Sequence, residues 1–373
     1  MRVLIVEGDV VTSYGRGLDV LWAGLLSGRT AIRPISRFPT GNFQTCHAAT
    51  VDDVDPAEPE SMVMQMLRPM IARSSSSIPR DAQLILASTV GEIEFLQREV
   101  ETGGHGAVRS CLRFLQRTLE RAWGLEGDGI TLSAACASST TAIAHGAGLI
   151  WSGECDAVLV VACDAVSEFV FAGFSSLLAL DPLIARPFDR HRAGLTLGEA
   201  AGYVLLMSEH RAVREGRQVM GEVCGWGLTS DAVHMTGPLR DGSGLARAIE
   251  KALARAEMEP SRIGSIAAHG TGTLYNDAME IRAFKAVRGL HAVPTYSIKG
   301  GTGHTLGAAG LVETLVAIRS ARERLAPPSV NLLECDDEAS GWVHRDAQPL
   351  RSALVVSTNS GFGGINAALV LSG

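Results

Sequence analysis

The chain has 373 residues, of which 46% are hydrophobic and 20% are charged, and its formal net charge is −7. This composition describes a folded globular protein with a large core and excludes a disordered chain. The negative charge argues against a nucleic-acid binder, which needs a basic face.

The N-terminal apolar stretch is interrupted by Glu7 and Asp9, too early for a signal peptide. No apolar run approaches the roughly 18 residues of a membrane-spanning helix, so we expect no membrane span. The seven cysteines are an odd number, which favours reduced thiols. These features predict a cytoplasmic protein.

Short strand-like runs alternate with helical stretches along the whole chain. This alternation predicts an α/β protein with largely buried sheets. The expected strands are residues 3–6, 83–87, 130–133, 157–163 and 202–207, followed by 220–225, 265–268, 295–298, 353–357 and 366–371.

Two segments of similar design occur in the two halves of the chain. "ITLSAACASSTTAIAHGAGLI" and "YSIKGGTGHTLGAAGLVETLV" each consist of a strand, a turn of small residues and a helix rich in Ala and Gly. Each half also ends on a similar strand, "AGYVLLMS" and "NAALVLSG". The repeat predicts two duplicated halves, 1–217 and 218–373, that share one core. Their central helices are expected to pack closely, because their side chains are small.

Cys136 lies in "LSAACASST", where a strand-like run passes into a helix. At a helix N-terminus the unpaired N–H groups and the dipole lower a thiol pKa, and the small neighbours leave room for an acyl group. The sequence therefore predicts an exposed, acidified nucleophile, with Cys46 lacking any such context. The alternative is a buried cysteine that acts as a small hydrophobic residue. We expect that structural role for Cys111, Cys155, Cys163, Cys224 and Cys335.

A second segment with residues that could act in catalysis is "AAHGTGTLYNDAMEIRAF". It places His269 at the end of a strand, before a tight glycine loop. Thr271 and Thr273 offer hydroxyl groups in that loop, and Glu280 lies on the helix that follows.

Two more segments lie closer to the C-terminus. "SIKGGTGHTLGAAG" places Lys299 at a strand end and His304 at a helix start, where a histidine stays neutral and can donate one hydrogen bond. "STNSGFGGINAA" is a glycine-rich turn around Phe362 whose N–H groups could face an oxyanion. For any one segment alone, a purely structural role is the default. We expect such a role for His145, His191 and His344.

Two other kinds of site fit the sequence less well. "GGTGHTLGAAG" imitates a dinucleotide-binding turn, but its glycines miss the G-x-G-x-x-G spacing, so a nicotinamide-dependent oxidoreductase is a remote alternative. The chain lacks C-x-x-C and paired-histidine spacings, and we therefore expect no metal site.

Taken together, the four segments are far more specific. "ACASS", "AHGTGT…ND…E", "K…GHTLGAAG" and "NSGFGG", in this order, resemble the β-ketoacyl-acyl-carrier-protein synthases of the elongating type. "RPFDRHRAGLTLGEAAGYVLL" and "SDAVHMTGP" match the same family between these motifs. The resemblance implies the thiolase fold, in which two duplicated α/β halves form five layers, αβαβα, and two chains form a dimer.

The resemblance also implies roles in a decarboxylating Claisen condensation. Cys136 resembles the nucleophile that accepts the acyl chain, and His269 and His304 resemble the pair that promotes decarboxylation of the malonyl thioester. Lys299 resembles the lysine that orders this site, with Glu280 as its expected ion-pair partner.

Further residues are implied as binding groups. The backbone N–H groups of Cys136 and Phe362 would form the oxyanion hole. Phe362 would also contact the substrate, Thr271 and Thr273 would contact the phosphopantetheine arm, and Val90 and Leu195 would line the acyl pocket. No cofactor is expected, because phosphopantetheine arrives on the acyl carrier protein.

Partners and pathway are the next implications. The acidic carrier protein needs a basic docking surface, for which Arg68, Arg73 and Arg80 are candidates.

"TNSGFGG" lacks the phenylalanine that fatty-acid enzymes carry there and looks more like type II polyketide or aryl-polyene ketosynthases. The dimer is expected to be a homodimer or a heterodimer with a ketosynthase-like partner. A non-catalytic chain-length-factor-like protein is the alternative function.

Overall fold

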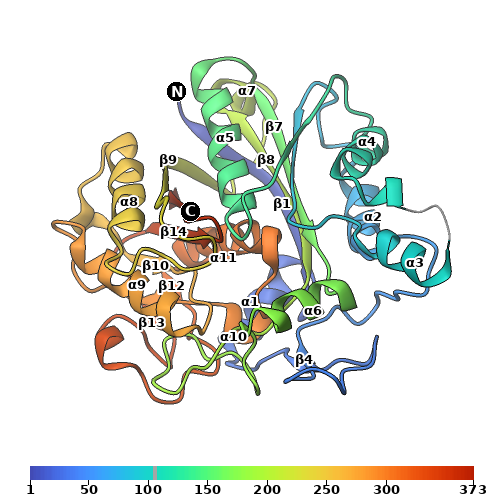
Figure 1. Cartoon of the computed structure of the whole chain (residues 1–373). Helices are drawn as coiled ribbons and strands as arrows, with labels where there is room; N and C mark the ends of the chain where they lie inside the picture. Colours follow the sequence, from blue (N-terminus) through green and yellow to red (C-terminus); the bar gives the residue numbers. More distant parts are fainter. Residues whose placement is uncertain (104–106) are drawn as a thin grey trace.

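The computed structural model describes residues 1–103 and 107–373 (Figure 1). The first half of the chain forms a sheet in the order β1, β8, β7, β5, β6. The first two contacts are antiparallel and the last two are parallel. The strands are β1 (Val3–Thr12), β8 (Ala200–Ser208), β7 (Ala157–Asp164), β5 (Gln83–Ala87) and β6 (Ile130–Leu132).

The second half repeats this design in the order β9, β15, β14, β10, β11, again with two antiparallel and then two parallel contacts. Its strands are β9 (Gly221–Ser230), β15 (Ile365–Ser372), β14 (Leu354–Gly361), β10 (Ser265–Ala267) and β11 (Thr295–Tyr296). The two sheets join where β1 pairs with β9. All ten predicted strands are confirmed, and the shared strand pattern explains the sequence repeat.

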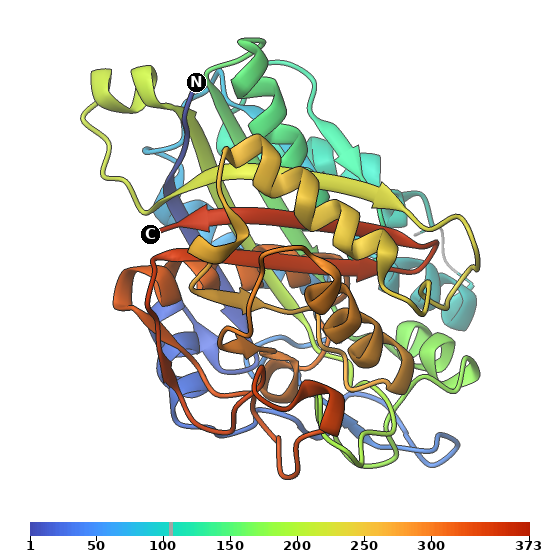
Figure 2. The same cartoon turned by 90° about the vertical axis from the view of Figure 1, so that its left-hand side faces the viewer.

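Helices separate and cover the two sheets, giving five layers (Figure 1). The central layer holds α5 (Ser138–Ser152) and α11 (Ala309–Glu323), which contact strands of both sheets. Helices α2 (Met62–Ser74) and α4 (Leu112–Trp123) cover the outer face of the first sheet. Figure 2 shows α8 (Ser243–Ala256) lying across the second sheet. The expected αβαβα arrangement is therefore present.

Shorter elements complete the fold. The helices are α1 (Leu18–Leu26), α3 (Glu94–Thr102), α6 (Glu168–Ser176), α7 (Glu209–Arg214), α9 (Leu274–Ala286) and α10 (Lys299–Thr302). The strands are β2 (Gly15–Arg16), β3 (Arg33–Pro34), β4 (His47–Ala48), β12 (Leu325–Ala326) and β13 (Gln348–Pro349). Within the described ranges, no helix is both long and apolar enough to cross a membrane.

The layers meet through separate hydrophobic cores. The largest lies between the sheets around α5 and α11. A second lies under the outer helices of the first half, and a third lies under those of the second half. Strand β7 is buried along its entire length, which explains why its sequence is a continuous apolar run rather than an alternating one.

The contact between the two central helices depends on a missing side chain. A Cβ atom placed on Gly310 of α11 would lie 1.9 Å from Oγ1 of Thr140 on α5. Only glycine permits this approach. The close packing predicted from the Ala- and Gly-rich repeats is confirmed, and it brings the N-terminal ends of α5 and α11 to one place.

Candidate active site

Cys136 lies in the turn between β6 and α5. Ala135, the preceding residue, has a φ of 49°, a conformation that costs energy for a residue with a Cβ atom. The hydroxyl of Ser138 holds the turn, since it donates to the Ala135 carbonyl and accepts from the Ala134 N–H. The strained turn places the thiol ahead of the helix N-terminus, as the sequence predicted.

The environment of the thiol differs from the prediction. Cys136 is buried, with 6% of its surface exposed, and this burial raises the pKa of its thiol to about 11. The positive charge of Lys299 and a hydrogen bond from the Phe362 N–H act in the opposite direction but do not outweigh burial. The expectation of an exposed, acidified cysteine is therefore wrong, because the helix terminus is covered by the second half of the protein.

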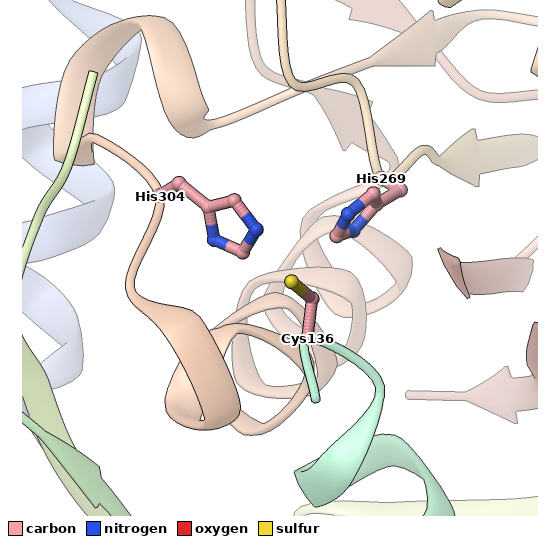
Figure 3. Close-up of side chains that lie close together, drawn as sticks. All are labelled: Cys136, His269 and His304. Carbon is pink, nitrogen blue, oxygen red and sulfur yellow. The ribbon is translucent and has the colours of Figure 1, made fainter. Parts of the chain in front are cut away.

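His269 and His304 face the same space as Cys136 (Figure 3). The ring centroids are 5.2 Å apart, and one ligand atom from each ring and the Cys136 sulfur all lie within 4.8 Å of one another. His269 follows β10, and His304 lies between α10 and α11. Three segments that are far apart in the sequence thus meet, as the motifs predicted.

Both rings are neutral and act as donors through Nε2. Burial, followed by the charge of Lys299, lowers the pKa of each histidine well below its usual range. In His304, Nδ1 accepts the Leu306 N–H at 3.1 Å. In His269, Nδ1 lies 3.2 Å from the Lys299 ammonium, which can only donate. With both Nδ1 atoms acting as acceptors, each ring carries its proton on Nε2.

The Nε2–H tautomers of His269 and His304 also decide how well this site suits a metal ion. A cysteine and two histidines at this separation are a donor set that zinc accepts in other proteins. A metal ion needs a lone pair from each ring, however, and here the Nδ1 lone pairs are occupied while Nε2 is protonated. The donor set fits hydrogen-bond donation to a substrate carbonyl better than it fits a metal.

Lys299 is paired with Glu313 of α11, and not with Glu280 as the sequence suggested. Both side chains of the pair are 2% exposed. Nζ also donates to the His269 carbonyl, so the lysine joins α11 to the histidine loop. The prediction of Glu280 is wrong because the fold brings α11, which carries Glu313, against Lys299. Glu313 carried a signal of its own, a lone charge in the apolar run "GLVETLVAI".

Glu280 has another task, which it shares with Asp277. Its carboxylate accepts the N–H groups of His269 at 2.7 Å and Gly270 at 2.6 Å. Asp277 accepts those of Thr271 at 3.0 Å and Gly272 at 3.2 Å. Two buried carboxylates on α9 therefore hold four consecutive N–H groups, which fixes the loop that carries His269.

The remaining predicted residues surround this centre. The hydroxyl oxygens of Thr271 and Thr273 lie 2.9 Å apart in the same loop. Phe362 lies between β14 and β15, and its ring stacks on that of Phe174 with centroids 6.1 Å apart. Leu195 belongs to a hydrophobic cluster around α6, against which Val90 packs.

That cluster lies next to the active centre. It includes Leu306, two residues after His304, and Phe174 packs against it. Asp164 links the segment of Val90 to the segment that follows His304. Its carboxylate accepts the N–H groups of Val90 at 3.0 Å and Gly307 at 2.7 Å. Leu195 and Val90 thus pack in one hydrophobic cluster, which reaches His304 through Leu306.

Family models match segments in both halves of the chain. The β-ketoacyl synthase N-terminal domain model matches residues 118–212, and the C-terminal domain model matches residues 220–333. A 3-oxoacyl-[acyl-carrier-protein] synthase 2 from Coxiella burnetii is 30% identical over 100% of this chain and 98% of its own length. The chain belongs to the β-ketoacyl synthase family.

Other relatives within this family come from polyketide pathways. A putative polyketide β-ketoacyl synthase 1 from Streptomyces virginiae is 32% identical and covers 99% of this chain and 97% of its own length. Among solved structures, the ishigamide ketosynthase/chain length factor has a TM-score of 0.91 at 30% identity, covering 100% of this chain and 98% of that one. A ketosynthase in complex with its chain length factor from Xenorhabdus doucetiae has a TM-score of 0.84 at 29% identity, covering 100% and 98%.

Proposed function

We propose that this β-ketoacyl synthase joins an acyl chain held on Cys136 to a malonyl unit carried by an acyl carrier protein. The observation that carries the proposal is the meeting of the Cys136 sulfur with two neutral Nε2–H histidines in a buried site. The carrier-protein substrate is supported by the names of relatives such as the 3-oxoacyl-[acyl-carrier-protein] synthase 2 from Coxiella burnetii.

In the first half-reaction, the Cys136 sulfur attacks the acyl-carrier thioester. A new thioester forms at Cys136, the bond to the carrier sulfur breaks, and the thiol proton leaves with the released carrier thiol. The Phe362 N–H and the charge of Lys299 stabilise the sulfur as its charge develops. The N–H groups of Cys136 and Phe362 would receive the oxyanion.

In the second half-reaction, malonyl thioester loses carbon dioxide. The electron pair of the broken C–C bond passes to the thioester oxygen as an enolate, which would accept hydrogen bonds from Nε2–H of His269 and His304. The enolate carbon then attacks the acyl group on Cys136, and the sulfur leaves as the β-ketoacyl product forms. Thr271 and Thr273 would bind the phosphopantetheine arm, so no resident cofactor is required.

The partners and the location are part of the same proposal. The two chain-length-factor complexes among the similar structures support a heterodimer with a ketosynthase-like partner over a homodimer. All seven cysteines lie in the described ranges and are free thiols, which supports a cytoplasmic location. The pathway is proposed to be polyketide or polyene elongation, because the relatives include polyketide synthases.

The carrier-docking prediction needs revision. Arg68 is ion-paired with Glu60, Arg73 with Asp9 at 2.6 Å, and Arg80 with Glu126 at 3.4 Å. These arginines therefore do not form an uncompensated basic surface.

A direct test is incubation of the purified protein with acyl carrier and with malonyl carrier, alone and together with its partner. Mass spectrometry should find the acyl group on Cys136, and labelled malonyl carrier should release carbon dioxide. If neither occurs with any carrier substrate, the chain is a non-catalytic partner of the chain-length-factor kind.

A further inference from the structure

Asn359 occupies a position beside the catalytic histidine that none of the steps above uses. It lies near the end of β14 and is completely buried. Its Nδ2 donates to Oε2 of Glu313 at 2.7 Å and lies 2.9 Å from Nδ1 of His269. Its Oδ1 accepts the hydroxyl of Thr140, which is on the helix that follows the nucleophile.

These partners fix the orientation of the amide. A carboxylate oxygen only accepts hydrogen bonds, so the amide nitrogen of Asn359 must face Glu313. Both protons of that nitrogen are then directed, one to Glu313 and the other to Nδ1 of His269. A donor at Nδ1 requires a lone pair there, which places the ring proton on Nε2.

Lys299 competes weakly for the same lone pair. An imidazole nitrogen has a single in-plane lone pair and accepts one good hydrogen bond. The Asn359 amide is 2.9 Å from Nδ1 and the Lys299 ammonium is 3.2 Å away. The ammonium has three protons, and with two of them it donates to Glu313 and to the His269 carbonyl, so its third proton reaches Nδ1 at the longer distance. The shorter contact makes the amide the principal donor.

We propose that Asn359 is a positioning residue for decarboxylation: it holds His269 in the Nε2–H tautomer and couples that ring to the Glu313–Lys299 pair. Lys299 lowers the basicity of His269 through its charge, and Asn359 supplies the nearer donor to Nδ1, which keeps the ring proton on Nε2. The Thr140 contact also fixes Asn359 relative to α5, so the ring keeps its orientation toward Cys136.

The tautomer can be measured without any activity. In the wild-type protein labelled with ¹⁵N-histidine, the His269 signals, assigned by their loss in His269→Gln, should show a protonated Nε2 and an unprotonated Nδ1 near neutral pH. A wild-type ring protonated on Nδ1 would overturn the proposal, whatever the variants do.

The variant to test is Asn359→Leu, which removes the amide at similar volume. The pH at which His269 becomes doubly protonated should rise, because a donor to Nδ1 disfavours a proton there. Carbon dioxide release from malonyl carrier should fall about 10- to 100-fold in kcat, less than the 10²–10³ expected when a donor to the oxyanion is lost outright. KM and acyl-enzyme formation at Cys136 should change little.

Ser360→Ala is the matched control. Ser360 is the next residue of the same strand, and its hydroxyl binds Asn366 and not the histidine. This variant should keep wild-type decarboxylation within about twofold, since the hydroxyl that it removes donates to Asn366 and a substitution away from the histidine network has a small effect. Should Asn359→Leu fail to fold, Asn359→Ser, which is too short to reach His269, gives the same comparison.

The prediction for carbon dioxide release rests on the proposed condensation, whereas the NMR measurement of His269 does not. If wild type releases no carbon dioxide, the proposed function fails, and the role of Asn359 in fixing the ring stands if Asn359→Leu still raises the pH at which His269 becomes doubly protonated. If Asn359→Leu leaves both the titration of His269 and carbon dioxide release unchanged, the positioning role is wrong. Equal loss of acylation and decarboxylation would show a general structural role instead.

Discussion

The ammonium group of Lys299 is ion-paired with the carboxylate of Glu313, and both are buried between the two halves of the protein. A buried pair of this kind adds little net stability when complete, but it is costly to break, because one charge is then left without a partner.

We therefore expect Glu313→Leu to lower the free energy of unfolding by about 3–5 kcal/mol. The double variant with Lys299→Met should lose less than the sum of the two single variants, with a coupling energy of about 0.5–3 kcal/mol. Urea denaturation of the four proteins of the cycle measures it. A parallel cycle with Glu280→Gln should show weaker coupling to Lys299; a stronger one would restore Glu280 as the partner.

Cysteine labelling should depend on burial and not on the helix N-terminus. Cys136 has a pKa of about 11, so its thiolate fraction and its reaction with iodoacetamide should rise about tenfold per pH unit between pH 7 and 10. Cys111 is exposed and should be modified first at neutral pH. Peptide mapping over time tests the order, and preferential labelling of Cys136 at pH 7 would contradict the effect of burial.

The two half-reactions should be separable by mutation. His304→Ala removes one donor to the enolate, and carbon dioxide release should fall by roughly 10²–10³ while Cys136 still becomes acylated. Cys136→Ala should show the reverse, with no acyl-enzyme but some decarboxylation. Mass spectrometry of the acyl-enzyme and trapping of labelled carbon dioxide distinguish the two. Normal carbon dioxide release in His304→Ala would show that this histidine has another role.

Replacing glycine by alanine should have opposite effects on stability at Gly310 and at Gly148. Gly310 lies in the contact between the central helices, and Gly148 does not. Gly310→Ala puts a Cβ atom 1.9 Å from Thr140 and 2.8 Å from Oδ1 of Asn359, so the helices must separate, and we expect a loss of about 1–3 kcal/mol. Gly148→Ala on α5 meets its nearest neighbour at 3.9 Å and should gain up to about 1 kcal/mol from helix propensity. Thermal unfolding of both variants makes the comparison; equal destabilisation would mean that the helix contact is not the cause.

Much of the protein follows from local sequence. Strand positions, the duplication and the three segments that carry Cys136, His269 and His304 are determined by short-range pattern, because apolar runs, glycine turns and small-residue helices depend on neighbours along the chain. The order of the motifs was enough to predict the family, and it also singled out the residues that are proposed to react.

The charges inside the site depended on the tertiary structure. Whether Lys299 pairs with Glu280 or Glu313, and whether Cys136 is acidic, depends on which helices cover the site, and this is a long-range property. Burial acts on a thiol more strongly here than the helix terminus does, because the second half of the chain removes water from it. The role of Asn359 arises in the same way, since its three partners come from α5, α11 and the loop after β10, which only the folded core brings together.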